Sequence, residues 1–262
     1  MNNKSWIAAL LIAACLVPMV RGDESAPRRW KATTGLDYSV GDYGDTEDTK
    51  ILYIPAMLRY TDFPWTLKLT VPYLQIDGPG DVVGGIDGGV VVGDTTSVDT
   101  EKNSGLGDVV ASVVYSIDPW TDAAPVIDLT GKAKLPTADE DKNLGTGEAD
   151  YTLQVDLSKS FGAWMPFVTL GYQFMGSSDT LELDNRPYAS VGSDYRVAKG
   201  TSLGAAYDWK QAATDTSDDS SEGSLYVNQK FDAGWSASLY TVAGFSDGSP
   251  AWGVGAQVGK SF

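Results

Sequence analysis

The sequence predicts an all-β protein: an antiparallel transmembrane β-barrel of about twelve strands that follows an N-terminal signal peptide. Three observations favour this fold. Apolar and polar residues alternate through many segments, each close to the roughly 9–11 residues that a membrane-spanning strand needs. Short and long connections between these segments alternate along the chain. Tryptophans gather at the ends of the segments, where a membrane meets water.

Residues 1–22 resemble a secretory signal peptide, which leaves 23–262 as the barrel domain. Lys4 supplies the positive start, and the apolar run from Trp6 to Val20 is about 15 residues long, short of the roughly 20 that a membrane helix needs. Val20 and Gly22 supply small residues ahead of the cut. Cys15 ends a stretch that resembles a lipoprotein box, but apolar residues follow it, so lipidation is the minor alternative.

Composition argues against several classes of function. The chain has 19 Lys and Arg against 35 Asp and Glu, and the net charge of −16 disfavours a nucleic-acid partner. It has no histidine, which excludes His-based catalysis and nearly every zinc site. Cys15 is the sole cysteine, so the chain has no pair for a disulfide. We therefore expect neither an enzyme nor a resident metal or cofactor.

Period-two alternation places one set of side chains against an apolar medium and the other against a polar one. In 65–76, for example, Trp65, Leu67 and Leu69 alternate with Thr66 and Lys68. The polar set is rich in Gly, Ser, Thr and charged residues, which suits a polar lumen. The predicted strands are 30–41, 50–60, 65–76, 105–117, 126–136, 149–160, 165–175, 188–197, 202–211, 223–231, 235–245 and 252–262.

The connections between the predicted strands fall into two groups. Tight links lie at 61–64, 162–164, 198–201 and 232–234. Long polar links lie between them, at 42–49, 77–104, 137–148, 176–187 and 212–222. Outer-membrane barrels have short periplasmic turns and long external loops, so the pattern also predicts which end of the barrel faces the exterior.

Aromatic residues provide an independent test of the membrane interpretation. The seven tryptophans after the signal peptide lie at strand ends or in short links: Trp30, Trp65, Trp120, Trp164, Trp209, Trp235 and Trp252. A soluble core would hold them in mid-strand, so a secreted β-sandwich explains the alternation but not the tryptophans. The terminal Phe262 resembles the signal that the outer-membrane assembly machinery reads, which makes that machinery an expected partner.

Three short motifs resemble those of a known family. They are Gly105-Leu106-Gly107-Asp108, Lys134-Leu135-Pro136-Thr137, and Leu144-Gly145-Thr146-Gly147 followed by Asp150. Their layout resembles the outer-membrane barrel family named for the meta-cleavage pathway of phenol degradation, over about residues 50–262. The family often has Gly after the second motif, where this chain has Ala138. The resemblance implies a barrel fold and the transport of aromatic or other small hydrophobic solutes.

Charged residues on the polar parity are predicted to line the lumen. One interpretation is a charge-lined solute path, in which rings of charge set selectivity. The alternative is that opposite charges pair and fill a narrow barrel. The predicted set is Lys31, Asp37, Arg59, Lys68, Lys132, Lys134, Asp156, Asp194, Arg196, Asp208, Lys210 and Lys230.

Several apolar residues share this inward parity. A purely aqueous pore would not need them, so they are candidates for the wall of a path for an aromatic solute. Packing of the interior is the alternative, since a shift of one residue in register moves a side chain to the other face. The set is Tyr53, Met57, Phe167, Met175, Tyr226 and Tyr240.

The longest connection, Asp77 to Ser104, is unusually apolar and rich in glycine. We expect it either to fold into the barrel mouth as a constriction or solute-capturing element, or to extend two strands as an external hairpin. Its candidate residues are Val82, Val83, Ile86, Val90, Val91 and Val92.

Acidic clusters mark three of the predicted external loops. Divalent cations can bridge such clusters to lipopolysaccharide phosphates, and a solvated acidic surface is the simpler alternative. The clusters are Asp45, Glu47 and Asp48; Asp139, Glu140 and Asp141; and Asp215, Asp218, Asp219 and Glu222.

Together these observations predict a channel in the outer membrane of a Gram-negative bacterium that passes small hydrophobic or aromatic solutes by passive diffusion. No nucleotide-binding motif is present to supply energy. The alternative is a closed structural or surface-interaction barrel whose acidic loops bind lipopolysaccharide, cations or a partner. The expected surroundings are outer-membrane lipid and lipopolysaccharide.

Overall fold

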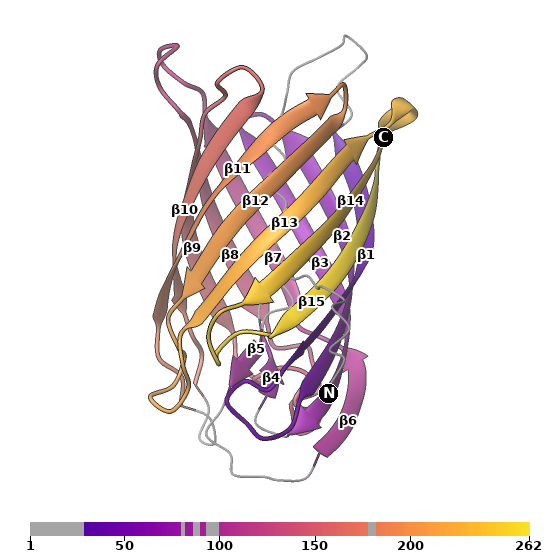
Figure 1. Cartoon of the computed structure of the whole chain (residues 1–262), viewed down its shortest axis with the longest axis vertical. Helices are drawn as coiled ribbons and strands as arrows, with labels where there is room; N and C mark the ends of the chain where they lie inside the picture. The colour runs from indigo at the N-terminus through magenta and orange to yellow at the C-terminus, as the bar shows by residue number, and fades with distance from the viewer. Residues whose placement is uncertain (1–28, 80–81, 86–89, 93–99, 178–181) are drawn as a thin grey trace, which may run out of the picture.

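The computed structural model describes residues 29–79, 82–85, 90–92, 100–177 and 182–262. They form a closed, antiparallel β-barrel (Figure 1). The predicted signal peptide, 1–22, lies outside these residues. Among the described residues, no helix is long and apolar enough to cross a membrane.

Thirteen strands pair in one sheet, and two more form a small second sheet. Because β6 and β7 follow one another along the same neighbour, β3, the barrel wall is twelve strands wide, as predicted. The strands are β1 Trp30–Gly41, β2 Thr49–Asp62, β3 Trp65–Pro79, β4 Val82–Gly84, β5 Val90–Val92, β6 Thr100–Leu106, β7 Val109–Ile117, β8 Val126–Leu135, β9 Asp150–Ser158, β10 Trp164–Phe174, β11 Arg186–Ala198, β12 Thr201–Lys210, β13 Ser220–Lys230, β14 Trp235–Gly244 and β15 Trp252–Ser261.

Pairing between the first and last strands closes the wall. β1 lies antiparallel to β15 over ten residue pairs, from Lys31 with Ser261 to Val40 with Trp252. Beyond them, the Phe262 amide donates to the Trp30 carbonyl at 2.9 Å. Closure satisfies backbone groups that would otherwise face lipid, which is the condition for a sheet to span a membrane.

The two ends of the barrel carry different connections. Short links join β2 to β3, β9 to β10, β11 to β12 and β13 to β14 at the end where Trp30 and Phe262 lie. Gly200 in one of them has φ +80, and a Cβ there would meet the Lys230 carbonyl oxygen at 2.6 Å, so the tight turn needs glycine. The opposite, long-loop end lies at the bottom of Figure 1, where β4, β5 and β6 are labelled.

One predicted strand, 105–117, is wrong as a continuous segment. The chain breaks it at Gly107 and Asp108, and β6 begins earlier than predicted, at Thr100. The Gly107 amide donates to the Pro72 carbonyl of β3 at 3.0 Å. The Asp108 side chain turns to accept hydrogen bonds from the next loop instead of continuing the ladder. The alternation of apolar and polar residues in the sequence does not reveal such a break.

The outer face of the barrel is apolar over most of its height. Leu67, Leu153 and Leu239 are each more than half exposed on it, which in water would be costly. Aromatic pairs ring both ends: Trp30–Tyr60, Trp65–Tyr115 and Trp164–Tyr195 at the short-turn end, and Tyr38–Trp252, Tyr172–Phe174 and Tyr207–Phe245 at the loop end. An apolar band between two aromatic girdles is typical of a membrane barrel and excludes the sandwich alternative.

Candidate functional site: the barrel lumen

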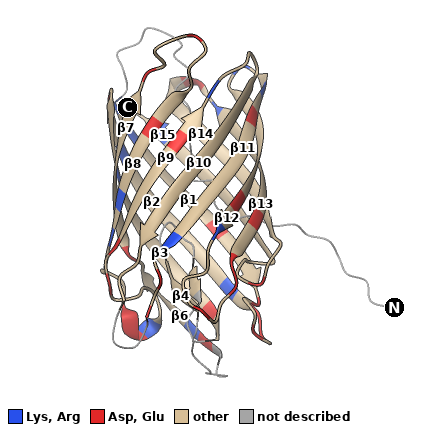
Figure 2. Cartoon of the chain, turned by 90° about the vertical axis from the view of Figure 1, so that its left-hand side faces the viewer, with Lys and Arg blue, Asp and Glu red and all other residues tan. Residues whose placement is uncertain are grey.

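Directly paired residues of antiparallel strands point to the same face of a sheet, so the register assigns each side chain to the lumen or the lipid. Charged positions occur along the strands as well as in the loops (Figure 2). The predicted charged residues in the body of the wall lie on the inner face. Arg196 and Lys230 share that parity but lie near the short-turn rim, where both are exposed. Their role in a solute path stays a prediction.

The three family motifs meet at one buried ion-pair cluster. Lys134 Nζ lies 3.0 Å from a carboxylate oxygen of Asp150 and 3.5 Å from one of Asp108. It also donates to Thr146 Oγ1 at 2.7 Å. Lys134 and Asp150 are fully buried, and Asp108 is 5% exposed. Lys134 is thus buried and paired with opposite charges, and its role in a solute path stays a prediction.

Asp108 also fastens the loop that follows the second motif. Its Oδ1 accepts hydrogen bonds from the backbone amides of Thr137 and Ala138, each at 2.9 Å. The Val109 amide donates to Thr137 Oγ1 at 2.9 Å. The break between β6 and β7 thus places one carboxylate where it joins a strand, a loop and a lysine.

Three other predicted carboxylates accept hydrogen bonds from neutral groups. Asp156 accepts from Gln154 at 2.8 Å and from Thr169 at 2.6 Å. Asp194 accepts from Tyr226 at 3.0 Å and from Ser202, and Asp208 accepts from Ser190. No ion pair to these three aspartates occurs among the described residues. The lumen is therefore polar along β9 to β13 without being neutralised pair by pair.

Asp37, on the opposite wall, differs from these three hydrogen-bonded aspartates. Its side chain is 2% exposed, and neither carboxylate oxygen has a hydrogen-bond partner in the described part of the chain. A Cβ added at Gly255 would lie 2.4 Å from Asp37 Oδ1 and 2.7 Å from Tyr240 Cζ, so Asp37 lies close to that ring. Its neighbour on β2 is Tyr53.

The predicted apolar residues fall at different heights of the lumen. Tyr53, Tyr226 and Tyr240 are each 8% exposed, and Tyr226 packs against Tyr240. Met57 and Phe167 are partly buried on the inner parity. Met175 follows β10 and packs at the loop end against the cluster that includes Val91 of β5. Their part in solute passage stays a prediction.

The two short strands β4 and β5 form a hairpin at the long-loop end (Figure 1). Val82 of β4 is 2% exposed and packs in a cluster with Ile51, Leu74 and Leu144. The Gly84 amide donates to the Asn143 carbonyl at 3.0 Å. This side of the hairpin is thus held by β2, β3 and the loop between β8 and β9.

The other side of the hairpin contacts different elements. Val91 of β5 is 1% exposed and packs with Leu183 and Ala213, from the loops that follow β10 and β12. The hairpin therefore bridges loops from opposite parts of the barrel at its mouth. Val83 is buried and Val90 packs against the first cluster, while Ile86 lies outside the described residues.

The strand extension that one interpretation of the long connection expects is present, and a constriction of the mouth stays a prediction. β3 and β6 do extend together beyond the wall, with pairs from Tyr73 with Leu106 to Pro79 with Thr100. The hairpin then packs inward on buried apolar clusters. Burial also raises the pKa of the Tyr43 phenol in the first cluster, so this hydroxyl stays neutral beneath the hairpin.

The acidic loop clusters make local contacts. Asp139 accepts a hydrogen bond from Lys142, which raises the pKa of that ammonium group. Asp219 accepts from Trp209 Nε1 and from the Ala212 amide. In the part of the chain that the structure describes, no three acidic, cysteine or histidine residues gather as a metal would require. Binding of cations or lipopolysaccharide stays a prediction.

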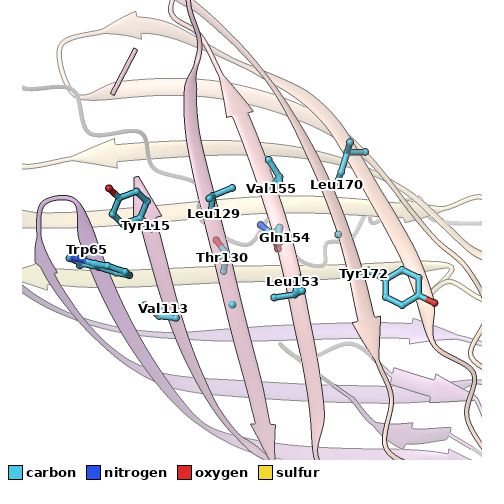
Figure 3. Close-up of a pocket in the computed structure, with 12 residues that line it drawn as sticks. Trp65, Val113, Tyr115, Leu129, Thr130, Leu153, Gln154, Val155, Leu170 and Tyr172 are labelled. Carbon is cyan, nitrogen blue, oxygen red and sulfur yellow. The ribbon is translucent and has the colours of Figure 1, made fainter. Parts of the chain in front are cut away.

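An apolar groove of about 460 Å³ lies on the outer face across β3 and β7 to β10 (Figure 3). Trp65, Leu129 and Leu153 line it, and Thr130 and Gln154 lie behind the ribbon. Gly131 is part of its floor, and the atom nearest to a Cβ there would be 3.7 Å away, on Val113. Since this face meets lipid, the groove suits an acyl chain and is separate from the lumen.

Sequence reasoning missed several lumen residues. Arg186 is 6% exposed and donates from Nε to Gln173 at 3.1 Å, but the predicted strand began two residues later. Tyr188 lies over Gly171 and donates to Gln154 at 2.6 Å. Alternation alone could not identify their partners, because the partners lie 13 to 34 residues apart in the chain.

The closed wall, the apolar outer band and the polar inner face define a bacterial outer-membrane β-barrel. The chain belongs to the family described as "Putative MetA-pathway of phenol degradation", whose model matches residues 33–259. This confirms the family resemblance and extends it toward the N-terminus. A comparison with curated proteins finds no match.

Three solved structures are similar to this chain. The COG4313 outer membrane channel from Pseudomonas putida F1 is 17% identical, with a TM-score of 0.67, over 92% of this chain and 100% of that one. The β domain of the Bordetella autotransporter BrkA is 14% identical, with a TM-score of 0.53, over 89% of this chain and 98% of that one. The P. putida toluene transporter TodX is 12% identical, with a TM-score of 0.47, over 90% and 91%.

Proposed function

We propose that this protein is a passive outer-membrane channel for small hydrophobic or aromatic solutes, and that it is not an enzyme. The observation that carries the proposal is the apolar mouth. At the long-loop end, the β4–β5 hairpin packs against the buried apolar side chains of Ile51, Leu74 and Ile76. A general aqueous pore would have no use for this lining. Membership of the family and the fold shared with a channel agree with it.

The proposed path begins at the hairpin, which narrows the mouth and contacts solute first. Tyr53, Tyr226 and Tyr240 lie on the inner face and offer ring faces to an aromatic body. Met57 and Phe167 continue the path toward the short-turn end. We propose that residues 1–22 direct the chain to the envelope and that Phe262 marks it for the assembly machinery.

Uptake into liposomes tests this function. Vesicles carrying the refolded mature chain are compared with protein-free vesicles for entry of a small phenolic solute and of a sugar of similar size. We expect the protein to speed the phenolic solute and not the sugar. Equal acceleration of both would indicate a general pore.

The second candidate is a closed structural barrel, with loops that bind lipopolysaccharide, cations or a partner. The observation that favours it is the hairpin itself, since it is anchored by Val82 and Val91 to two sides of the mouth. Deletion of residues 82–92 separates the two functions. A constriction predicts faster entry of the sugar in the deletion variant, whereas unchanged uptake of both solutes together with loop-dependent binding supports the structural barrel.

A further inference from the structure

Three cationic residues form a row across adjacent strands on the inner face, near the short-turn end. Lys31 of β1 is paired directly with Arg59 of β2, and Arg59 is paired directly with Lys68 of β3. Paired side chains in an antiparallel sheet have Cβ atoms about 4.5–5.5 Å apart. Like charges at that spacing destabilise a sheet, so the row needs an explanation beyond filling the barrel.

In the register of the described strands, no carboxylate is paired within the row or directly beside it. The row is continued by Ser261 on β15 and by Ser112 on β7. The next inner level toward the loop end is neutral as well, consisting of Gly259, Thr33, Met57, Thr70 and Val110. In the described ranges, no ion pair involves Arg59 or Lys68.

The nearest acidic residue on these strands is already engaged. Asp62, at the end of β2, has the opposite parity to Arg59 and pairs with Arg29 at 3.1 Å. The Lys31 side chain runs along the wall, since its Cε would lie 2.5 Å from a Cβ at Gly259. Arg59 and Lys68 are partly exposed on the inner face.

We propose that the row formed by Lys31, Arg59 and Lys68 binds the carboxylate of a small organic anion and makes the barrel prefer anionic solutes to neutral or cationic ones. Two guanidinium or ammonium groups on neighbouring strands supply several N–H donors to one planar carboxylate, and hydrogen bonds between charged partners are the strongest available. Met57, the next inner residue of β2, gives the apolar body of the solute a contact beside the charge. The claim that the solute has an apolar body rests on the proposed function, whereas the claim of an anion site does not.

Three probes with one ring and different charge test the row: 4-fluorobenzoate, 4-fluorobenzyl alcohol and 4-fluorobenzylamine. Their binding to the barrel in nanodiscs is followed by ¹⁹F NMR line broadening. We expect the benzoate to bind about tenfold more tightly than the alcohol, as one charge-assisted contact implies, and the amine to bind most weakly. The preference should shrink as salt is raised, because salt screens exposed charges.

The double variant R59Q/K68Q should bind benzoate and alcohol equally. The matched control is Lys50→Gln, which removes an exposed lysine from the same strand β2 and should keep the preference. Folding of each variant is checked by circular dichroism and by the heat-dependent shift of its gel mobility. Equal binding of benzoate and alcohol to the unaltered barrel would overturn the proposal, as would a preference that survives in R59Q/K68Q.

Liposome uptake of the same probes distinguishes a failure of the anion site from a failure of the proposed channel function. If benzoate binds at the row but no probe crosses the bilayer faster, the channel function fails and the anion site stands. If all three probes enter equally fast, the channel function stands and the anion preference fails.

Discussion

Lys134 and Asp150, paired across β8 and β9, form a fully buried ion pair at 3.0 Å inside the barrel. Asp108 joins them from the break between β6 and β7. A buried charge that loses its partner keeps its desolvation cost, so the cluster is stable only when complete.

The first prediction concerns this cluster. Lys134→Met leaves two buried carboxylates without a cation and should lower the free energy of unfolding by about 3–5 kcal/mol. Guanidinium unfolding of the barrel in lipid vesicles measures it, with Lys50→Met as the exposed control. The triple variant K134M/D108N/D150N should recover part of the loss, because no charge is then left buried. A loss that is equal in the single and triple variants would contradict this account.

Asp37 provides the contrasting case. Its buried carboxylate has no hydrogen-bond partner in the described residues, so the native barrel gains nothing from the charge. Asp37→Asn should therefore raise stability by about 1 kcal/mol. The same unfolding measurement tests it, and Asp150→Asn, which should destabilise, is the matched comparison. Destabilisation by both changes would show that Asp37 has a partner of its own.

Substitution of Gly84 tests the packing of the β4–β5 hairpin against the barrel wall. A Cβ at this position would meet the Leu144 carbonyl oxygen at 2.5 Å and Leu74 Cδ2 at 2.6 Å. Gly84→Val should push the hairpin off the wall and open the mouth. Sugar entry into liposomes should then rise severalfold while the barrel stays folded. Sugar entry at the level of the unaltered protein would count against a constriction.

Gly131 and Gly171 lie on opposite faces of the same wall. Gly131→Ala adds a methyl group to the open outer groove and should raise stability by about 0.5–1 kcal/mol. Gly171→Ala places the methyl group 2.1 Å from the Tyr188 ring and should lower stability by about 1–3 kcal/mol. Vesicle unfolding of the two variants side by side should give opposite signs. Equal effects would argue against the assigned register.

Substitution of Phe262 tests whether this residue acts in assembly of the barrel and not in its stability. Its backbone pairs with Trp30, and its side chain is 59% exposed on the outer face. Phe262→Ala should change the stability of the refolded barrel by less than about 1 kcal/mol, because an exposed side chain loses little packing. In cells, the amount of barrel in the outer membrane should fall strongly. Normal amounts in the membrane would remove Phe262 from the assembly signal.

Much of the wall follows from local pattern. The segments 30–41, 65–76 and 252–262 differ from β1, β3 and β15 by no more than a few residues at either end. Period-two alternation is strong here because one face meets lipid and the other a polar lumen, so each residue is constrained by its own surroundings. The lumen-facing parity of Arg59 and Lys68 follows from the same constraint.

Contacts between distant segments could not be read in the same way. Lys134 stands in an alternating strand like any other inward lysine, and nothing nearby reveals that Asp108 and Asp150 surround it. The break at Gly107 and the inward fold of the β4–β5 hairpin are equally invisible to alternation.

Chain pattern alone was sufficient for the barrel and its strand number, because lipid and water act on every strand separately. The closure of β1 on β15, the buried cluster at Lys134 and the apolar mouth around Val82 depend on which strands become neighbours. That choice is made only when the sheet curls and closes, since pairing energy then acts between residues far apart in the chain.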